Sequence, residues 1–126
     1  MFKQILLVAA GGATGSVCRH LVGVACVRLF GIGFPWGTVA VNLLGSFAMG
    51  VLIELLARRF EMSMELRLLL ATGFLGGFTT FSSFSLDAVA LVERGAGLLA
   101  FAYVAGSVLL GLAALFAGLS LVRALG

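Results

Sequence analysis

Four long apolar segments, separated by short polar stretches, occupy most of this 126-residue sequence, at about residues 5–30, 38–57, 68–92 and 98–122. A helix needs about 20 mostly apolar residues to cross the hydrocarbon core of a bilayer. Only 10% of the residues are charged, against about 25% in a typical soluble domain, which is too few to cover a water-exposed surface. We therefore predict an all-α membrane protein, with four transmembrane helices forming a single domain over residues 1–126.

The basic residues favour one orientation and argue against one class of partner. With four spans, both termini lie on one side of the membrane, together with Lys3, Arg58, Arg59, Arg67 and Arg123. Arg28 and Arg94 are expected on the other side, or three basic residues if Arg19 is counted there, so a modest excess of Lys and Arg predicts that the termini are cytoplasmic. The net charge of +3 comes from scattered residues with no basic run, so nucleic-acid binding is not expected.

The third apolar segment is interrupted at its centre. Gly76 and Gly77 each cost roughly 1 kcal/mol of helix propensity, and five hydroxyl residues follow them, at Thr79, Thr80, Ser82, Ser83 and Ser85. Lipid offers no hydrogen bonds, so irregular backbone at membrane depth must be surrounded by protein or line a cavity. We expect this helix to be broken in mid-membrane, where free carbonyls can bind a cation and free amides an anion. A kinked packing helix is the alternative interpretation.

Polar side chains also lie within the second and fourth segments. Thr38, Asn42 and Ser46 are four residues apart and share one helix face, as do Tyr103 and Ser107. Such groups either hydrogen-bond between helices or form a row of donors along a path through the membrane.

Charged residues inside the expected spans are few. Arg19 follows Gly11 and Gly15, whose spacing allows close helix packing. The Arg19 side chain either extends to the lipid headgroups or places its positive charge near an anion entrance. We expect neither Glu54 nor Asp87 to have a basic partner at helical spacing. A proton-coupled transporter is expected to centre on a membrane carboxylate, so abundant donors favour a passive path for an anion.

The chain resembles the Fluc (CrcB) family of fluoride channels over almost its whole length. The resemblance is carried by Gly11-Gly12-x-x-Gly15-x-x-x-Arg19, Gly37-Thr38-x-x-Val41-Asn42-x-x-Gly45 and Gly76-Gly77-Phe78-Thr79-Thr80-Phe81-Ser82-Ser83-Phe84. The sequence departs from the family pattern at Ser83, where Thr is frequent, and at Asp87, where Glu is common.

The resemblance implies an inverted, dual-topology homodimer with two pores along its interfaces, an arrangement that the five-to-two bias of basic residues does not favour. It implies a passive channel, not an enzyme, that lies in the inner (plasma) membrane, exports cytoplasmic fluoride and confers fluoride resistance. The anion pore would be lined by Asn42, Phe81, Phe84, Ser82, Ser83, Thr80, Tyr103 and Ser107. A structural sodium ion would be held by the backbone carbonyls of Gly76 and Thr79 from both subunits. Arg19, Thr38 and Asp87 are candidates for a vestibule or for packing.

Other functions are considered from the residues alone. A small exporter of organic cations should carry an acidic residue deep in an early helix, and the first segment has none. In a non-transporting membrane scaffold, the alternation of Phe and hydroxyl residues would have no function. An enzyme is not expected, because the single histidine, His20, lies beside Arg19 and no His, Cys or carboxylate cluster forms a catalytic set. Cys18 and Cys26 are about 12 Å apart on one helix, too far for a disulfide.

Overall fold

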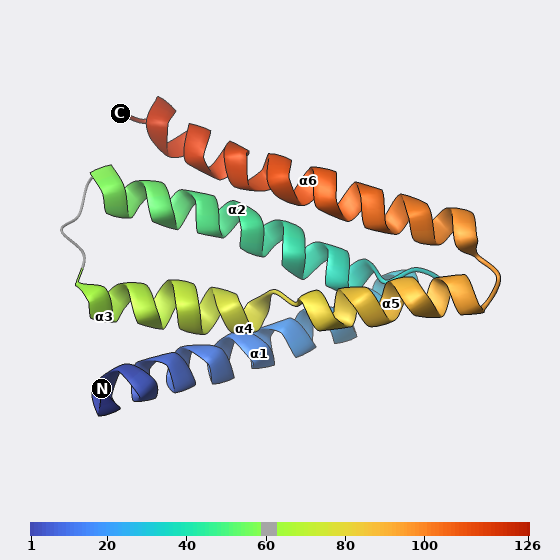
Figure 1. Ribbon diagram of the computed structural model, residues 1–126, viewed down its shortest axis with the longest axis horizontal. Coiled ribbons are helices and arrows are strands. Elements are labelled where there is room, and N and C mark those ends of the chain that lie inside the picture. Colours follow the sequence, from blue (N-terminus) through green and yellow to red (C-terminus); the bar gives the residue numbers. More distant parts are fainter. Residues whose placement is uncertain (59–62) are drawn as a thin grey trace.

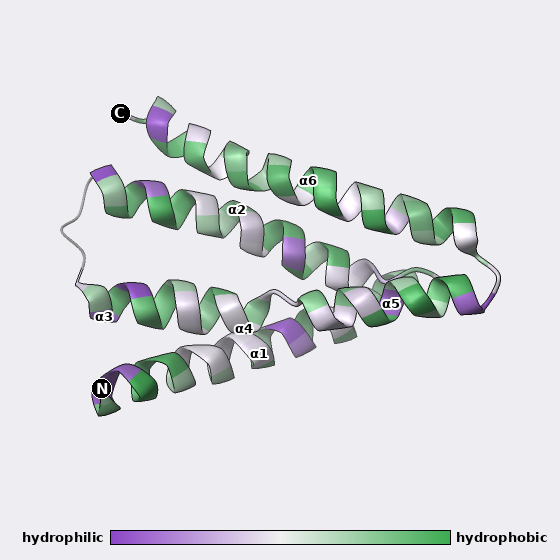
Figure 2. Ribbon diagram, viewed as in Figure 1, coloured by the Kyte–Doolittle hydropathy of each residue, from purple (hydrophilic) through white to green (hydrophobic). Residues whose placement is uncertain are grey.

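The computed structural model describes residues 1–58 and 63–126, and within them every regular element is a helix. Four helical stretches are long and apolar enough to cross a membrane, at Phe2–Phe30, Trp36–Arg58, Met64–Glu93 and Gly97–Ala124. They lie roughly along one direction, with both termini at the same end (Figure 1). Hydrophobic residues lie along the whole length of every helix, and most hydrophilic turns lie near the helix ends (Figure 2). The prediction of an all-α, four-span membrane protein is confirmed.

The observed helices extend up to four residues beyond the predicted spans. The first and second are α1 (Phe2–Phe30) and α2 (Trp36–Arg58), and the last is α6 (Gly97–Ala124). Hydropathy marks only the part that lies in hydrocarbon, whereas a helix continues through flanking polar residues that still gain backbone hydrogen bonds. Arg59 and Glu61, which the sequence places in a polar loop, lie outside the described residues.

The third span consists of several helical pieces. It begins with α3 (Met64–Arg67), continues as a π-helix, η1 (Leu68–Leu75), and then as the short α4 (Gly76–Phe78). Thr79 and Thr80 are both extended, with φ/ψ of −86°/160° and −151°/123°, before α5 (Phe81–Glu93) begins. The predicted break is therefore confirmed, and it follows the Gly-Gly pair by one residue. A π-helix is rare and is often found at functional sites.

Close contact between α1 and the third span depends on small residues. A Cβ atom on Gly15 would overlap the carbonyl oxygen of Phe74, and one on Gly77 would lie 2.5 Å from the carbonyl oxygen of Gly12. The backbones therefore touch directly, as small residues allow in membrane helices. This contact holds η1 and α4, the two elements just before the break, against α1.

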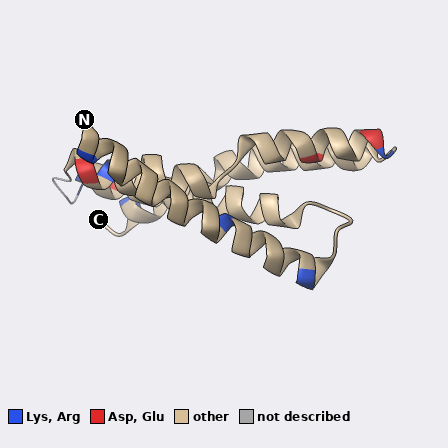
Figure 3. Ribbon diagram, turned by 90° about the horizontal axis from the view of Figure 1, so that it is seen from below, with Lys and Arg blue, Asp and Glu red and all other residues tan. Residues whose placement is uncertain are grey.

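Charged residues gather at the two ends of the bundle, with few between them (Figure 3). Glu54 is only 8% exposed and accepts hydrogen bonds from Arg58, one turn later, and from Arg123 of α6. The expectation that Glu54 lacks a basic partner at helical spacing is wrong, since its spacing to Arg58 is that of a normal i, i+4 ion pair. Arg123 joins α6 to the same carboxylate through a contact that the sequence does not indicate.

Candidate functional site

Asn42 of α2 bridges the backbone at the break. Its Oδ1 accepts a hydrogen bond from the Thr80 amide at 2.8 Å, and its Nδ2 donates to the Thr80 carbonyl at 3.0 Å. The side-chain amide thus replaces the peptide partner that Thr80 loses when the helix unwinds. An extended residue at membrane depth requires such a partner, because lipid supplies none. One N–H of the Asn42 amide remains for another acceptor.

Thr80 also begins the next helix. Its hydroxyl accepts a hydrogen bond from the Ser83 amide at 3.2 Å, which is an N-cap of α5. The Ser82 hydroxyl lies 3.5 Å from the same oxygen. Threonine is a favoured N-cap residue, and this cap is consistent with α5 starting at Phe81.

An open groove of about 260 Å³ lies beside the break. It is lined by α2, the break, α5 and α6, through Asn42, Ser46, Thr79, Thr80, Phe81, Phe84, Ser107, Val108 and Gly111. We call it the break groove. Five of the eight residues that the resemblance assigns to the pore lie here, and none of the lining residues is charged. The Ser107 hydroxyl is buried, with no hydrogen-bond partner in the described part of the chain. Such a group calls for a partner that the described residues do not supply.

Two phenylalanine rings form part of this groove. The Phe81 and Phe84 ring centroids are 5.8 Å apart, with an interplanar angle of 43°. Phe84 packs against Tyr103 at 5.1 Å, whereas Phe81 is 78% exposed. The Phe84 ring is therefore packed within the chain, whereas the Phe81 ring projects from the surface of the chain.

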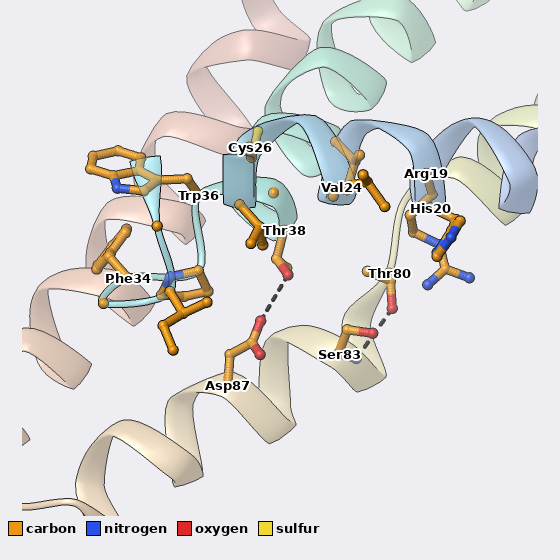
Figure 4. Close-up of a pocket in the computed structure, with 18 of the residues that line it drawn as sticks. Arg19, His20, Val24, Cys26, Phe34, Trp36, Thr38, Thr80, Ser83 and Asp87 are labelled. Carbon is orange, nitrogen blue, oxygen red and sulfur yellow. Dashed lines mark hydrogen bonds between the residues drawn. The ribbon is translucent and has the colours of Figure 1, made fainter. Parts of the chain in front are cut away.

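A larger cavity of about 800 Å³ lies between the second half of α1, the following loop, the start of α2, and α5. Figure 4 shows some of the residues around it. Its Arg, His and carboxylate side chains are Arg19, His20, Arg28, Arg94 and Asp87, so the arginines outnumber the single carboxylate. We call it the basic cavity. Of the residues assigned to the pore, Thr80 and Ser83 lie along its wall.

Asp87 lies at the basic cavity and accepts hydrogen bonds from two hydroxyls. Thr38 Oγ1 donates to Asp87 Oδ2 at 2.7 Å, and the Tyr103 hydroxyl donates to the same oxygen at 3.1 Å. The sequence groups Tyr103 with Ser107 in one polar strip, but the structure separates them. The Tyr103 hydroxyl points to Asp87, whereas Ser107 borders the break groove. The carboxylate is thus paired with hydroxyl donors that sequence spacing does not reveal.

Arg19 reaches from α1 to the third span. Its Nε donates to the Gly77 carbonyl at 3.0 Å, and the side chain is half-buried at the wall of the basic cavity. Carbonyls at a helix C-terminus carry partial negative charge, so a guanidinium there is favourable. The Arg19 side chain therefore links α1 to the third span beside the break.

Replacing Arg19 by methionine is expected to lower the free energy of unfolding by about 2 kcal/mol, because a hydrogen bond from a charged donor to a partly buried carbonyl is lost. The measurement is thermal or denaturant unfolding of the purified protein in detergent. Arg28→Met is the matched control, since Arg28 is an exposed arginine of the same helix. Equal stability of the two variants would contradict the role of the Arg19–Gly77 contact.

Backbone carbonyls are the groups here that suit a cation. In the part of the chain that the structure describes, no cluster of three or more His, Cys, Asp or Glu side chains can hold a metal ion. The carbonyls of Gly77 and Thr80 accept side-chain donors. Among the described residues, no side chain or loop amide donates to the carbonyls of Gly76 and Thr79, and Gly76 is exposed. Carbonyl oxygens that accept no side-chain or loop donor are the type of group that a hard cation prefers.

Known proteins identify the family. The model of the CrcB-like protein, camphor resistance (CrcB) family matches residues 6–119. A Rhizobium etli protein named fluoride-specific ion channel FluC is 61% identical over 122 residues, covering 97% of this chain and 98% of the relative. An Agrobacterium fabrum protein of the same name is 64% identical over 121 residues, covering 95% and 96%. One from Rhizobium meliloti is 53% identical over 123 residues, covering 98% of each. The chain therefore belongs to the CrcB family of multi-pass membrane proteins.

Proposed function

We propose that this chain is a fluoride channel of the bacterial plasma membrane, as the names of its relatives indicate for those proteins. The observation that carries the proposal is the break groove, which joins an unpaired Ser107 hydroxyl, the Asn42 amide and two phenylalanine rings. Fluoride is compact and strongly hydrated, so it must exchange water for other donors. Hydroxyl and amide protons supply them, and the positive edges of aromatic rings assist without binding the anion tightly.

Passive conduction is the transport mode that this lining supports. The groove has no carboxylate that could couple fluoride to a proton. Fluoride enters acidified cells as neutral HF and is trapped inside as the ion. A fluoride-selective channel would let it leave down its electrochemical gradient and so confer fluoride resistance. Such a function is transport rather than catalysis.

The basic cavity is proposed as the approach to this path. Arg19, His20, Arg28 and Arg94 outnumber the single carboxylate, Asp87, along its wall. Positive potential in a cleft raises the local concentration of small anions. Its volume of about 800 Å³ is far larger than a fluoride ion, so the anion would remain hydrated until it reaches Thr80 and Ser83 near the break.

Replacing Phe81 or Phe84 by isoleucine is expected to reduce fluoride efflux from proteoliposomes at least about tenfold, because isoleucine fills similar space without a positive ring edge. A fluoride electrode measures the efflux under an ion gradient. Phe116→Ile is the control, since Phe116 is an exposed residue of α6 that does not line the break groove. Wild-type efflux in both groove variants would remove these rings from the path, and no efflux from the wild type would refute the channel.

We also propose that two copies assemble as an inverted, antiparallel homodimer with two pores. The support is that a single chain leaves the break groove open, with Phe81 projecting from it and Gly76 exposed. A second copy can cover all three features. The test is a Gly126→Cys variant in which Cys18 and Cys26 are replaced by alanine. Dual topology predicts labelling of the new thiol from both sides of the membrane, and labelling from one side alone would contradict it.

A structural sodium ion is proposed at the carbonyls of Gly76 and Thr79 from both copies. The support is that these two carbonyls accept no side-chain donor among the described residues and lie in the last turn of the helical stretch formed by η1 and α4, where carbonyls carry partial negative charge. When bound, the ion would join the two copies at the break by neutralising these oxygens. A ligand at 100 times its dissociation constant stabilises a fold by about 2.7 kcal/mol. Exchanging sodium for N-methylglucamine should therefore lower the melting temperature of the purified protein, and an unchanged value would argue against the site.

A further inference from the structure

A series of aromatic contacts connects the loop before α2 with the break groove. The Phe34 ring of the loop lies 5.5 Å from the Tyr103 ring, at an interplanar angle of 88°. Tyr103 in turn contacts Phe84 at 5.1 Å, and Phe84 contacts Phe81 at 5.8 Å. We propose that Phe34, which does not line the groove, is a positioning residue for the anion path through its contact with Tyr103. The inference rests on the proposed fluoride channel.

Tyr103 is where these contacts meet. Its side chain is 1% exposed and packs in a buried cluster with Leu91 and Ala100. Its hydroxyl donates to Asp87, and one side of its ring meets Phe84. The perpendicular contact with Phe34 is the edge-to-face arrangement that aromatic pairs favour. Phe34 therefore limits the orientations that both the Tyr103 hydroxyl and the ring next to Phe84 can adopt.

The loop is held firmly enough for this role. Gly31 turns the chain at a φ of 78° after α1, in the left-handed region that favours glycine. Arg94, at the end of α5, donates to the Gly33 carbonyl, and the Trp36 amide donates to the Phe34 carbonyl at 2.9 Å. The Phe34 ring also contacts the Trp36 ring at 4.7 Å. Figure 4 shows these two residues close together, at the opposite end of the basic cavity from Thr80 and Ser83.

A matched control lies in the same region. Phe30 contacts Trp36 at 5.8 Å, as Phe34 does, but it is 62% exposed, and no ring contact joins it to Tyr103 in the described chain. Phe30→Leu thus removes an aromatic contact beside the loop without touching Tyr103. Phe34→Leu removes the contact with Tyr103 as well. The comparison separates positioning of Tyr103 from general packing of the loop.

The experiment uses the fact that Tyr103 is the only tyrosine of the chain. Biosynthetic 3-fluorotyrosine gives one ¹⁹F resonance, recorded for purified full-length protein without added fluoride. Phe34→Leu is expected to shift or broaden this resonance and to reduce fluoride efflux from proteoliposomes at least fivefold. Phe30→Leu should change neither. Phe34→Tyr, measured without the label, keeps a ring at position 34 and is expected to retain efflux.

Unchanged efflux in Phe34→Leu, with or without a moved resonance, would overturn the proposal. Reduced efflux with an unmoved resonance would also overturn it, because Phe34 would then act by another route. If Phe34→Leu does not yield a monodisperse protein, Phe34→Met is measured with the same criteria. Absence of efflux from the wild type would refute the proposed channel instead, while the ¹⁹F comparison would still decide whether Phe34 orients Tyr103.

Discussion

Replacing Gly15 by alanine is expected to lower the free energy of unfolding by about 3 kcal/mol, the upper part of the range for overpacking a close contact. The added Cβ would overlap the Phe74 carbonyl oxygen and lie 3.0 Å from the Phe78 amide nitrogen. Both are backbone atoms, which cannot rotate away as a side chain can. Either α1 must move away from the third span, or the π-helix must rearrange. Thermal unfolding of the purified protein in detergent measures the loss.

Gly23→Ala is the matched control for this prediction. It lies two turns later on α1, and a Cβ there would meet nothing within 4 Å. Since alanine is favoured over glycine in a helix by about 1 kcal/mol, this variant should be as stable as the wild type or more so. Equal stability of the two variants would contradict the close packing of Gly15 against η1 and α4.

Replacing Asn42 by aspartate is expected to reduce fluoride efflux on the order of a thousandfold. The carboxylate can still accept from the Thr80 amide but cannot donate to the Thr80 carbonyl, and it places a negative charge beside the break groove. Repulsion between two unit charges 4 Å apart is about 4 kcal/mol at an effective dielectric constant of 20. Each 1.4 kcal/mol added to a barrier slows passage about tenfold. Efflux from proteoliposomes measures the result.

Two further variants separate charge from support of the break. Asn42→Ala leaves both backbone groups of Thr80 without their partner, which should cost about 1–3 kcal/mol for each unsatisfied group. It should therefore lower thermal stability as well as efflux. Ser46→Ala removes a hydroxyl from the same groove wall without touching the break and is expected to have a much smaller effect. Comparable efflux in Asn42→Asp and Ser46→Ala would contradict the role of Asn42.

Much of the architecture follows from the sequence alone. Hydropathy and helix propensity are local properties, so the four spans and the interruption after Gly76 and Gly77 can be predicted from short stretches of chain. The same holds for the cap of α5 by Thr80, a residue type favoured at that position, and for the Glu54–Arg58 pair, whose i, i+4 spacing is visible in the sequence. Interactions between residues within one helical turn can be predicted without knowing the remainder of the fold.

The tertiary structure decided which polar groups meet. Arg19 and Gly77 are 58 residues apart in the sequence, and Asn42 and Thr80 are 38 apart, so their hydrogen bonds depend on how the helices are packed and rotated. The same packing directs the Tyr103 hydroxyl to Asp87 and leaves Ser107 beside the break groove, although the two residues share one helix face. In this chain the sequence by itself determined the helices and the position of the break. Only the packing of those helices determined which carbonyls are bonded and which polar groups remain free, because both depend on distances between segments that local sequence does not encode.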